Sequence, residues 1–243
     1  LTPEIREYVG VPVHHSFGFG RVRAVLNAGG ACLVPQAGFA LTELRDRLRA
    51  GDVNAVSAVP SQWRVFLANL DVFGPELERV RWVEIGSQPM TADEKRALRR
   101  ALPAARILQH YGLTEASRTT LLRIDQAPEA ALASVGRAEG ATGLRIADDG
   151  VIEIRGPHVA LGVAQSGGWR PLGPERWLRT SDLGRLEDGW LFHEGRADDV
   201  INCGGVKLSP DAVEAHVRAA VPEAGEDFGV LRTPDLLRGD SIT

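Results

Sequence analysis

The sequence predicts an α/β protein: a doubly wound parallel sheet with a small β-rich subdomain, followed by the start of a small α+β C-terminal domain. Three observations predict it. Short strand-like runs alternate with single amphipathic helices over residues 31–109, and strands joined by single helices pair in parallel. From about residue 118, turn signals separate short strand-like runs instead. After Gly195 the pattern changes again, into a Gly-Gly loop and a capped helix, so we place a domain boundary between residues 197 and 198.

The elements of the first half follow one another as strand, helix, strand. The expected strands are residues 31–34, 53–59, 80–85 and 106–109. Leucines at helical spacing from 41 to 48 predict a helix that Gly51 ends. Ser61 is expected to cap the next helix, and Thr91 with Glu94 predicts a capping box for a helix that runs to about Leu102.

The second half contains two predicted hairpins. One joins Ile146 to the run 151–154 through Asp148-Asp149-Gly150, and the other joins 182–186 to 190–192 through Glu187-Asp188-Gly189. A helix is then expected with Ser209 as its cap, Pro210 at its first position and Pro222 at its end. These elements predict a β-rich unit and a separate C-terminal unit.

Composition excludes several classes of protein. The 28 Lys and Arg against 32 Asp and Glu give a net charge of −4, which argues against a general binder of nucleic acid or anionic membranes. The two cysteines, Cys32 and Cys203, have neither disulfide nor zinc spacing, which fits a reducing cytoplasm. No apolar run approaches the ~18 residues of a membrane helix, and the N-terminus has no signal-peptide pattern. We therefore expect a cytoplasmic protein.

Two features of the sequence concern the ends of the chain and the supply of lysine for catalysis. The chain opens at Leu1 and stops at Thr243 as a new segment begins, so we expect both ends to continue in a longer parent. Lys95 and Lys207 are the only lysines among the 28 basic residues. Lys95 follows the capping box on an arginine-rich helix, so we expect it to be a solvated surface residue.

Three segments carry candidate site residues. His110-Tyr111-Gly112-Leu113-Thr114-Glu115 follows the fourth strand, where ligands bind in doubly wound sheets, and offers an aromatic face, a hydroxyl and a carboxylate. Gly86-Ser87-Gln88-Pro89 follows the neighbouring strand, and Asp182 of Thr180-Ser181-Asp182 has a carboxylate suited to two ribose hydroxyls. Residues 110–115 could instead be an ordinary loop with a buried tyrosine, and residues 86–89 a generic turn. Residues 180–182 could be the capped entrance to a hairpin.

The fourth segment carries a resemblance. Residues 195–214 contain Gly195-Arg196-Ala197-Asp198-Asp199-Val200-Ile201, then Gly204-Gly205, then Pro210 to Glu214. This order resembles the interdomain hinge and glycine loop of the adenylate-forming acyl-CoA synthetase and ligase superfamily. Tyr111 to Glu115 resembles that family's adenine and phosphate motif. Val151 to Pro157 and Thr180 to Asp182 match its next two motifs, and Val11 to Gly18 looks like its upstream strand with a pocket histidine. The resemblance covers essentially the whole chain.

The resemblance implies a role for each matching residue. Tyr111 and Gly112 would face adenine, with Gly86, Ser87 and Gln88 lining the base. Thr114 would contact the α-phosphate and Glu115 would hold Mg²⁺, which makes these two the catalytic candidates and Glu115 the metal ligand. Asp182 would bind the ribose hydroxyls, and Arg196 would reach the ribose or phosphate. His15 and His110 would border the acyl pocket, Asp198 would be the hinge, and Gly204, Gly205 and Lys207 would meet the thiol substrate. The alternative for Lys207 is an ordinary loop lysine.

The implied reaction is ATP-dependent activation of a carboxylic acid to an acyl-adenylate, with AMP leaving when a thiol is acylated. ATP, Mg²⁺ and either CoA or a phosphopantetheine carrier protein are the implied cofactors and partners. The family's lysine-containing phosphate loop and near-terminal lysine are absent from the sequence, and Asn202 stands where relatives often have lysine. We therefore expect this chain alone to be a poor adenylating enzyme, and pyrophosphate exchange at parent-like rates would contradict that.

Two alternatives stay open at this point. One is the amino-acid adenylation domain of a peptide synthetase, although those domains usually continue Lys-Ile-Arg-Gly where this chain has Asn202-Cys203-Gly204-Gly205. The other is a non-catalytic nucleotide-binding module. Fatty, aryl and small acids are all compatible with the sequence as substrates.

Overall fold

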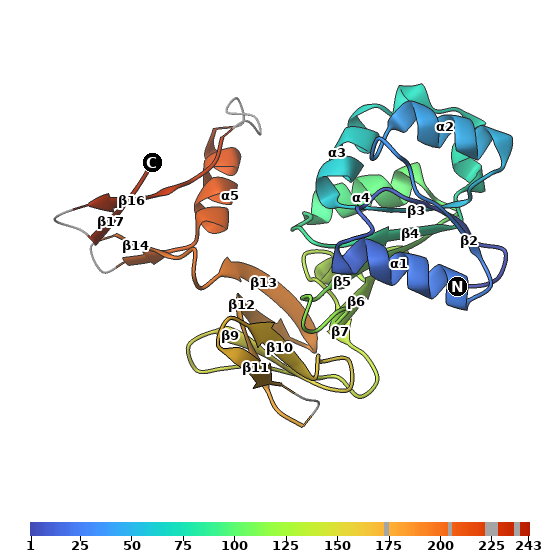
Figure 1. Cartoon of the computed structure of the whole chain (residues 1–243). Coiled ribbons are helices and arrows are strands. Elements are labelled where there is room, and N and C mark those ends of the chain that lie inside the picture. The colour runs from blue at the N-terminus through green and yellow to red at the C-terminus, as the bar shows by residue number, and fades with distance from the viewer. Residues whose placement is uncertain (173–174, 204–205, 222–227, 236–238) are drawn as a thin grey trace.

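A computed structural model covers residues 1–243 and describes all of them except 173–174, 204–205, 222–227 and 236–238. Figure 1 shows a helix-covered sheet, a β-rich part beneath it and a C-terminal part with its own sheet and helix. The predicted fold class is confirmed at this level.

The main sheet is mixed, with five parallel strands followed by two antiparallel ones. Its order is β2-β1-β3-β4-β5-β6-β7 in the described part of the chain. The parallel pairs run from β2 to β5, and β6 and β7 extend the β5 edge. The strands are β1 Arg6–Val9, β2 Ala31–Leu33, β3 Ala55–Ala58, β4 Trp82–Ile85, β5 Arg106–Tyr111, β6 Thr120–Arg123 and β7 Arg137–Ala138.

Helices cover both faces of this sheet (Figure 1). Helix α1 (Ser16–Asn27) packs on β1 and β2, while α2 (Leu41–Ala50), α3 (Pro60–Ala68) and α4 (Ala92–Ala101) lie on the opposite side. The Thr91 capping box is confirmed, because Glu94 N donates to Thr91 Oγ1 at 3.2 Å and Thr91 N donates to the Glu94 carboxylate at 2.6 Å. Single 3₁₀ turns occupy Leu70–Val72, Pro75–Arg79 and Glu129–Ala131.

The sequence analysis missed β1 and α1 for one shared reason. The segment Val11 to Gly18 is not a strand, since β1 ends at Val9 and α1 begins at Ser16. The buried face of α1 includes Phe17, Arg21 and Val25, and β1 contains the buried Glu7. Arg21 pairs with Glu7, so a charged residue interrupts the apolar pattern of both elements.

Two local predictions in the first half were wrong. Ser61 does not cap α3, because Pro60 already occupies its first position and Val59 N donates to the Gln62 side chain at 3.0 Å. Lys95 is not a surface residue, because it is fully buried and its Nζ donates to Ser134 O at 2.8 Å. Burial lowers the pKa of Lys95 to about 7, and the nearby Glu94 charge only partly opposes this.

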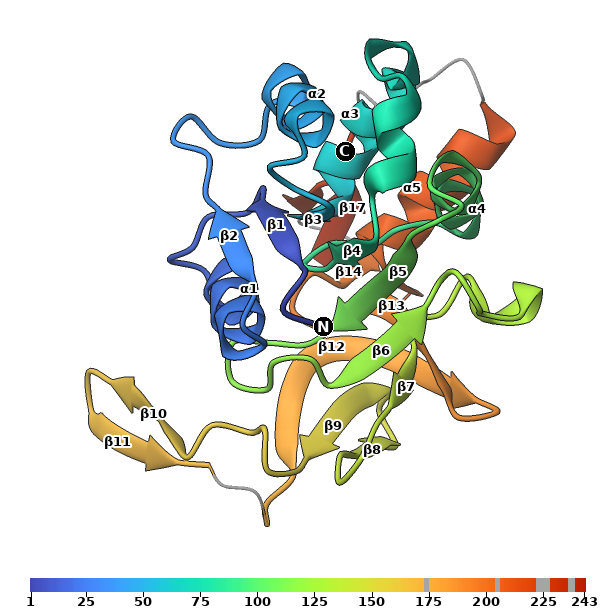
Figure 2. The same cartoon turned by 90° about the vertical axis from the view of Figure 1, so that its right-hand side faces the viewer.

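The β-rich part forms a second sheet of order β13-β12-β9-β8. Its strands are β8 Gly143–Ile146, β9 Val151–Arg155, β12 Leu178–Glu187 and β13 Trp190–Arg196. Both predicted hairpins are confirmed, and Asp188 and Gly189 turn with φ of 49° and 78°. A further hairpin, β10 Gly162–Gln165 with β11 Gly168–Pro171, projects from this part in Figure 2.

The C-terminal part is α+β, with sheet order β15-β14-β17-β16 and helix α5 (Pro210–Ala220). The strands are β14 Ile201–Cys203, β15 Val206–Leu208, β16 Arg232–Asp235 and β17 Gly239–Ile242. Ser209 precedes α5 as predicted, although its side chain makes no capping bond, and Pro222 lies outside the described residues. A short link after β13 joins the two parts, and the boundary at 197/198 stays a prediction.

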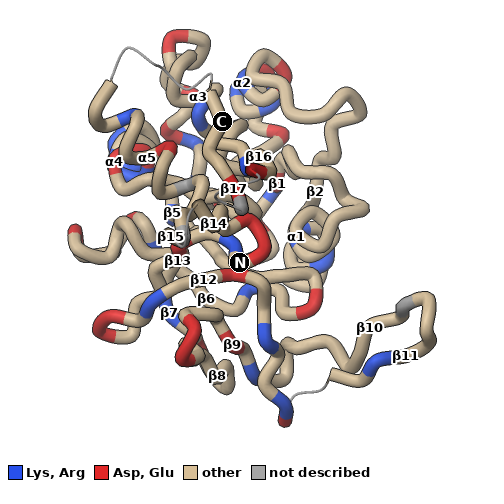
Figure 3. Tube along the Cα trace, turned by 90° about the vertical axis from the view of Figure 1, so that its left-hand side faces the viewer, with Lys and Arg blue, Asp and Glu red and all other residues tan. Residues whose placement is uncertain are grey.

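Acidic and basic residues are interspersed on the same elements, as in α4 (Figure 3). None of the described helices combines the length and apolar character needed to cross a bilayer.

Candidate functional site

A cleft of about 900 Å³ lies where the carboxyl ends of β4 and β5 meet the β-rich and C-terminal parts. Parallel sheets place the ends of neighbouring strands at one edge, which explains why loops distant in sequence meet here. Its walls come from all three parts of the chain: residues 87–90 and 109–113, then Ala133 and Val135, then 182–183 and 193–196, and finally Asp199, Val200, Leu208, Ser209 and Ala212.

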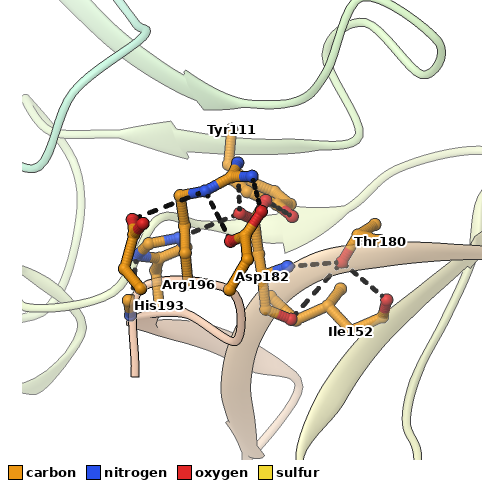
Figure 4. Close-up of polar contacts among 9 residues, drawn as sticks. Tyr111, Ile152, Thr180, Asp182, His193 and Arg196 are labelled. Atoms are coloured by element: carbon orange, nitrogen blue, oxygen red, sulfur yellow. Dashed lines mark hydrogen bonds and ion pairs between the residues drawn. The ribbon is translucent and has the colours of Figure 1, made fainter. Parts of the chain in front are cut away.

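The centre of the cleft is a bond between the main sheet and the β-rich part. Tyr111 at the end of β5 donates its hydroxyl to Asp182 Oδ2 at 2.7 Å. Thr180 fixes the Asp182 backbone, since Asp182 N donates to Thr180 Oγ1 at 3.0 Å and that hydroxyl donates to Ile152 O at 2.8 Å. Figure 4 shows the side chains of Tyr111, Thr180 and Asp182 meeting between β5 and β12, with the Ile152 carbonyl of β9 beside Thr180. Asp182, only 4% exposed, is therefore held rigidly at the cleft wall.

The second oxygen of Asp182 faces two cationic or ionisable groups. Arg196 Nη1 lies 3.6 Å and His193 Nε2 3.8 Å from Oδ1. Burial alone would raise the pKa of Asp182, but the contacts from His193 and Tyr111 outweigh it and lower that pKa. Burial and the Asp182 charge together raise the pKa of Tyr111. At neutral pH the site thus presents an ionised acceptor beside a neutral phenol, whose ring packs 5.8 Å from that of His193.

Arg196 links this site to the segment that leads into the C-terminal part. Its guanidinium donates to both oxygens of Asp198, at 3.0 and 2.6 Å, and lies 3.6 Å from Asp199. Asp198 is about half exposed and stands between β13 and β14. The predicted hinge residue is therefore tied to the predicted nucleotide-binding arginine.

The loop after β4 forms the opposite wall. Ser87 and Gln88 line the cleft, and Ser87 adopts a left-handed φ of 76°. Gln88 is fixed by accepting from Ser61 N at 3.1 Å. Gly86 lies directly beneath the His110 ring, because a Cβ at this position would overlap His110 Nε2. The structure therefore brings Gly86, Ser87 and Gln88 together with His110, Tyr111 and Gly112 as the sequence predicted.

Other predicted residues lie outside this constellation. Thr114 and Glu115 follow β5 in the turn beyond Leu113 and are not part of the cleft wall. His15 is exposed at the N-terminus of α1, with its ring 4.4 Å from that of His14. Gly204 and Gly205 lie outside the described residues, as does the Lys207 side chain. In the described part of the chain, no three His, Cys, Asp or Glu side chains gather to hold a metal.

Sequence reasoning missed three contributors. His193, an isolated histidine in the sequence, lines the cleft beside Asp182. Gln109, 1% exposed, lines the cleft with an Oε1 that has no protein partner among the described residues. Glu84 lies beside His110, with its Oε1 3.2 Å from Nδ1, although Nδ1 makes no hydrogen bond to the described residues. A single carboxylate inside the apolar strand Trp82–Ile85 was the available signal for Glu84.

The comparisons decide the family. The profile of the family described as AMP-binding enzyme matches residues 4–163, about two thirds of the chain. The chain belongs to the AMP-binding enzyme family. The match spans the main sheet and reaches into the β-rich part, so the predicted resemblance is confirmed.

Curated relatives of this AMP-binding chain are CoA ligases. It is 27% identical to the 3-[(3aS,4S,7aS)-7a-methyl-1,5-dioxo-octahydro-1H-inden-4-yl]propanoyl:CoA ligase of Rhodococcus jostii, over 94% of this chain and 45% of the relative. It is 29% identical to the oxalate–CoA ligase of Arabidopsis thaliana, over 100% of this chain and 49% of the relative. The chain thus spans about half the length of the curated relatives it matches.

Solved structures share the fold. The o-succinylbenzoate CoA synthetase of Bacillus subtilis, solved in complex with the acyl-adenylate intermediate OSB-AMP, superposes with a TM-score of 0.81 at 23% identity, over 100% of this chain and 51% of that one. The AMP-binding chain therefore has the fold of half of that enzyme.

Proposed function

We propose that this AMP-binding chain serves in ATP-dependent activation of a carboxylic acid to an acyl-adenylate, followed by transfer of the acyl group to the thiol of CoA. In the first step a carboxylate oxygen bonds to the α-phosphorus while the bond to pyrophosphate breaks. In the second, a thiol sulfur bonds to the acyl carbon and AMP leaves with the oxygen. The CoA ligases among the curated relatives support CoA as the acceptor.

The Tyr111–Asp182 pair is the observation that carries this proposal. An ionised, rigidly held carboxylate can accept both ribose hydroxyls, and its low pKa keeps it an acceptor at neutral pH. We assign adenine to the space between Tyr111 and the loop of Gly86, Ser87 and Gln88. The buried and unpartnered Oε1 of Gln109 on the same wall fits an amino group that donates a hydrogen bond.

The phosphate end is assigned to the turn beyond Gly112. Thr114 would donate to the α-phosphate and Glu115 would supply one carboxylate to Mg²⁺, which stabilises the charge on phosphate oxygens when bound. One carboxylate plus substrate phosphates is an ordinary Mg²⁺ donor set, so the lack of a three-residue cluster among the described residues fits this ion. Arg196, already beside Asp182, would reach the ribose or phosphate.

The position of Lys95 favours nucleotide binding without catalysis by this chain on its own. Its Nζ is buried and donates to Ser134 O, and Lys95 is not among the described residues that line the cleft. Among the described residues that line the cleft, Arg196 is the cation placed to meet the phosphates, together with Mg²⁺ when it is bound. We therefore propose nucleotide and acyl-adenylate binding by this chain, with full adenylation in a protein that adds further cationic groups.

Calorimetric titration of the chain with AMP tests binding, and ATP–pyrophosphate exchange by the product of the complete gene tests chemistry. We expect AMP to bind and GMP to bind at least tenfold more weakly, because the guanine 2-amino and 6-oxo groups change the hydrogen-bonding pattern offered to Gln109 and the Ser87 loop. Equal affinities, or no AMP binding by the folded chain at millimolar concentrations, would refute the site. No exchange with any acid by the complete protein would refute the reaction.

A further inference from the structure

Two segments that are distant in sequence form the wall of the cleft beside α4. One is the loop that leads into this helix, residues 87–90. The other follows the 3₁₀ turn Glu129–Ala131, and its Ala133 and Val135 line the cleft. Ser134 stands between these two residues and is itself fully buried. The spacing of the two segments therefore sets the width of the cleft on this side.

Lys95 joins the two segments beneath the cleft. It lies near the start of α4, it is fully buried, and its Nζ donates to Ser134 O at 2.8 Å, 39 positions away. A lysine is a costly residue at such a position, because its amine has to leave water. A methionine would fill a similar space without that cost. What the lysine adds is the hydrogen bond to Ser134 O.

The segment that Lys95 reaches is also bonded to both sheets that border the cleft. Val135 O accepts from Thr120 Oγ1 of β6 at 2.6 Å. Val135 N donates to Leu191 O of β13 at 2.7 Å. Residues 134–135 are thus the point at which α4, the main sheet and the β-rich part are bonded to one another. Lys95 supplies the bond from α4.

We propose that Lys95 is a positioning residue for the nucleotide site, which holds the wall at Ala133 and Val135 against the loop before α4 through its bond to Ser134 O. The inference rests on the proposed function, which places the nucleoside in this cleft. Without the amine, Ser134 O loses that bond while it lies inside the protein, so arrangements in which the segment moves toward water become more populated. Nucleotide binds the held arrangement, and its apparent affinity falls with the population of that arrangement.

Calorimetric titration of Lys95→Met with AMP at pH 8 tests the proposal. Methionine keeps an unbranched apolar side chain in the core and removes the donor to Ser134 O. We expect AMP to bind about three- to tenfold more weakly than to the wild-type chain, which is the range that the loss of one net hydrogen bond allows. Thermal melts establish that both proteins are folded at the temperature of the titration, so a change in global stability alone leaves the affinity unaltered.

The pH dependence of the AMP affinity is a second measurement. Burial lowers the pKa of Lys95 to about 7, so the amine gains a proton as the pH falls from 8.5 to 6. A charged amine favours arrangements in which it reaches water, so the wild-type chain should lose more affinity over this range than Lys95→Met. The neighbouring charges, Glu94 on α4 and its partner Arg64 on α3, are present in both proteins. His193 and the phosphate of AMP also titrate in both, so the difference between the two curves belongs to Lys95.

Two further variants separate the wall from the rest of the core. Thr120→Val removes the donor to Val135 O with little change in shape, and it should also weaken AMP binding about three- to tenfold. This variant tests the held wall independently of whether Lys95→Met folds. Arg100→Met, at an exposed position of α4, is the matched control and should leave the AMP affinity unaltered.

Three results would overturn the inference. An unchanged AMP affinity in folded Lys95→Met, or parallel pH curves for this variant and the wild-type chain, would limit Lys95 to a role in stability. An unchanged affinity in Thr120→Val would show that the site does not depend on a held wall. Failure of the wild-type chain to bind AMP would refute the proposed function and this inference with it, and the wild-type titration separates that case from the others.

Discussion

Arg21→Met should strongly destabilise the protein, because Arg21 is the cation between two buried carboxylates. Glu84 would keep Arg118 as a partner, but Glu7 would lose both of its bonds while remaining fully buried. Breaking a buried pair by removing one partner costs about 3–5 kcal/mol. The free energy of unfolding of a typical domain is about 5–15 kcal/mol, so this loss is a large share of the total stability.

Urea unfolding followed by tryptophan fluorescence measures the effect. The buried Trp63 reports on the core beneath α3, so the transition should be visible in this signal. Arg47→Met is the matched control, because Arg47 is 44% exposed and its pairs with Glu43 and Asp52 are solvated. Such surface pairs contribute about 0–1 kcal/mol, so the control should unfold close to the wild-type midpoint.

A double-mutant cycle tests the cause of the loss. If the cost comes from an unpaired Glu7 charge, Arg21→Met combined with Glu7→Gln should recover about 1–3 kcal/mol relative to Arg21→Met alone. A loss below 1 kcal/mol in the single variant would show that water reaches the network. A double variant no more stable than the single one would show that lost packing, and not the buried charge, sets the cost.

Three further predictions concern the nucleotide site, the link to the C-terminal part and a buried lysine. Asp182→Ala should weaken AMP binding by tenfold or more, because charge-assisted hydrogen bonds contribute about 1.5–3 kcal/mol each and a factor of ten in affinity is about 1.4 kcal/mol. Asp46→Ala, at an exposed position, is the control. An AMP affinity of Asp182→Ala that calorimetry finds unchanged would remove Asp182 from the site. Asp198→Pro, which fixes φ near −65°, should leave adenylation by the complete protein largely intact and strongly reduce thioester formation; an equal loss in both assays would contradict a hinge. Lys95 has a pKa of about 7 in the folded protein and an ordinary value of 10.5 when unfolded, so the unfolded chain binds more protons between these two pH values. The free energy of unfolding should therefore rise by about 3 kcal/mol from pH 7 to 9.5 relative to that of Lys95→Met. If the urea midpoints of the two proteins change with pH by the same amount, the lysine is solvated.

Sequence alone predicted the elements whose pattern is local. The capping box of Thr91 with Glu94, the turns at Asp148-Asp149-Gly150 and Asp188-Gly189, and Pro210 at the start of α5 each depend on a few neighbouring residues. Backbone geometry at such positions is restricted by the residue type itself, so tertiary contacts did not change the outcome. The motif order likewise sufficed to predict the family, since the matched segments are contiguous in sequence.

Only the tertiary structure decided which charges are buried. Lys95, Glu7, Arg21 and Glu84 have the sequence signature of solvated residues, and their burial depends on partners up to 63 positions away. A charge enters the interior when a partner offsets its desolvation, or, for Lys95, when it can be neutralised near pH 7. Neither condition is visible in a local pattern, and for this reason β1 and α1 were missed.

The same distinction holds at the candidate site. The sequence named Tyr111 and Asp182 separately, and the fold joined them by a 2.7 Å bond across 71 positions. Gln109 and His193 could not be predicted, because a strand-end glutamine and an isolated histidine become cleft residues only when the main sheet meets the β-rich part. The sequence thus determined which functional groups are available. The packing of parallel strands, whose carboxyl ends lie at one edge of the sheet, determined that these groups meet in one cleft.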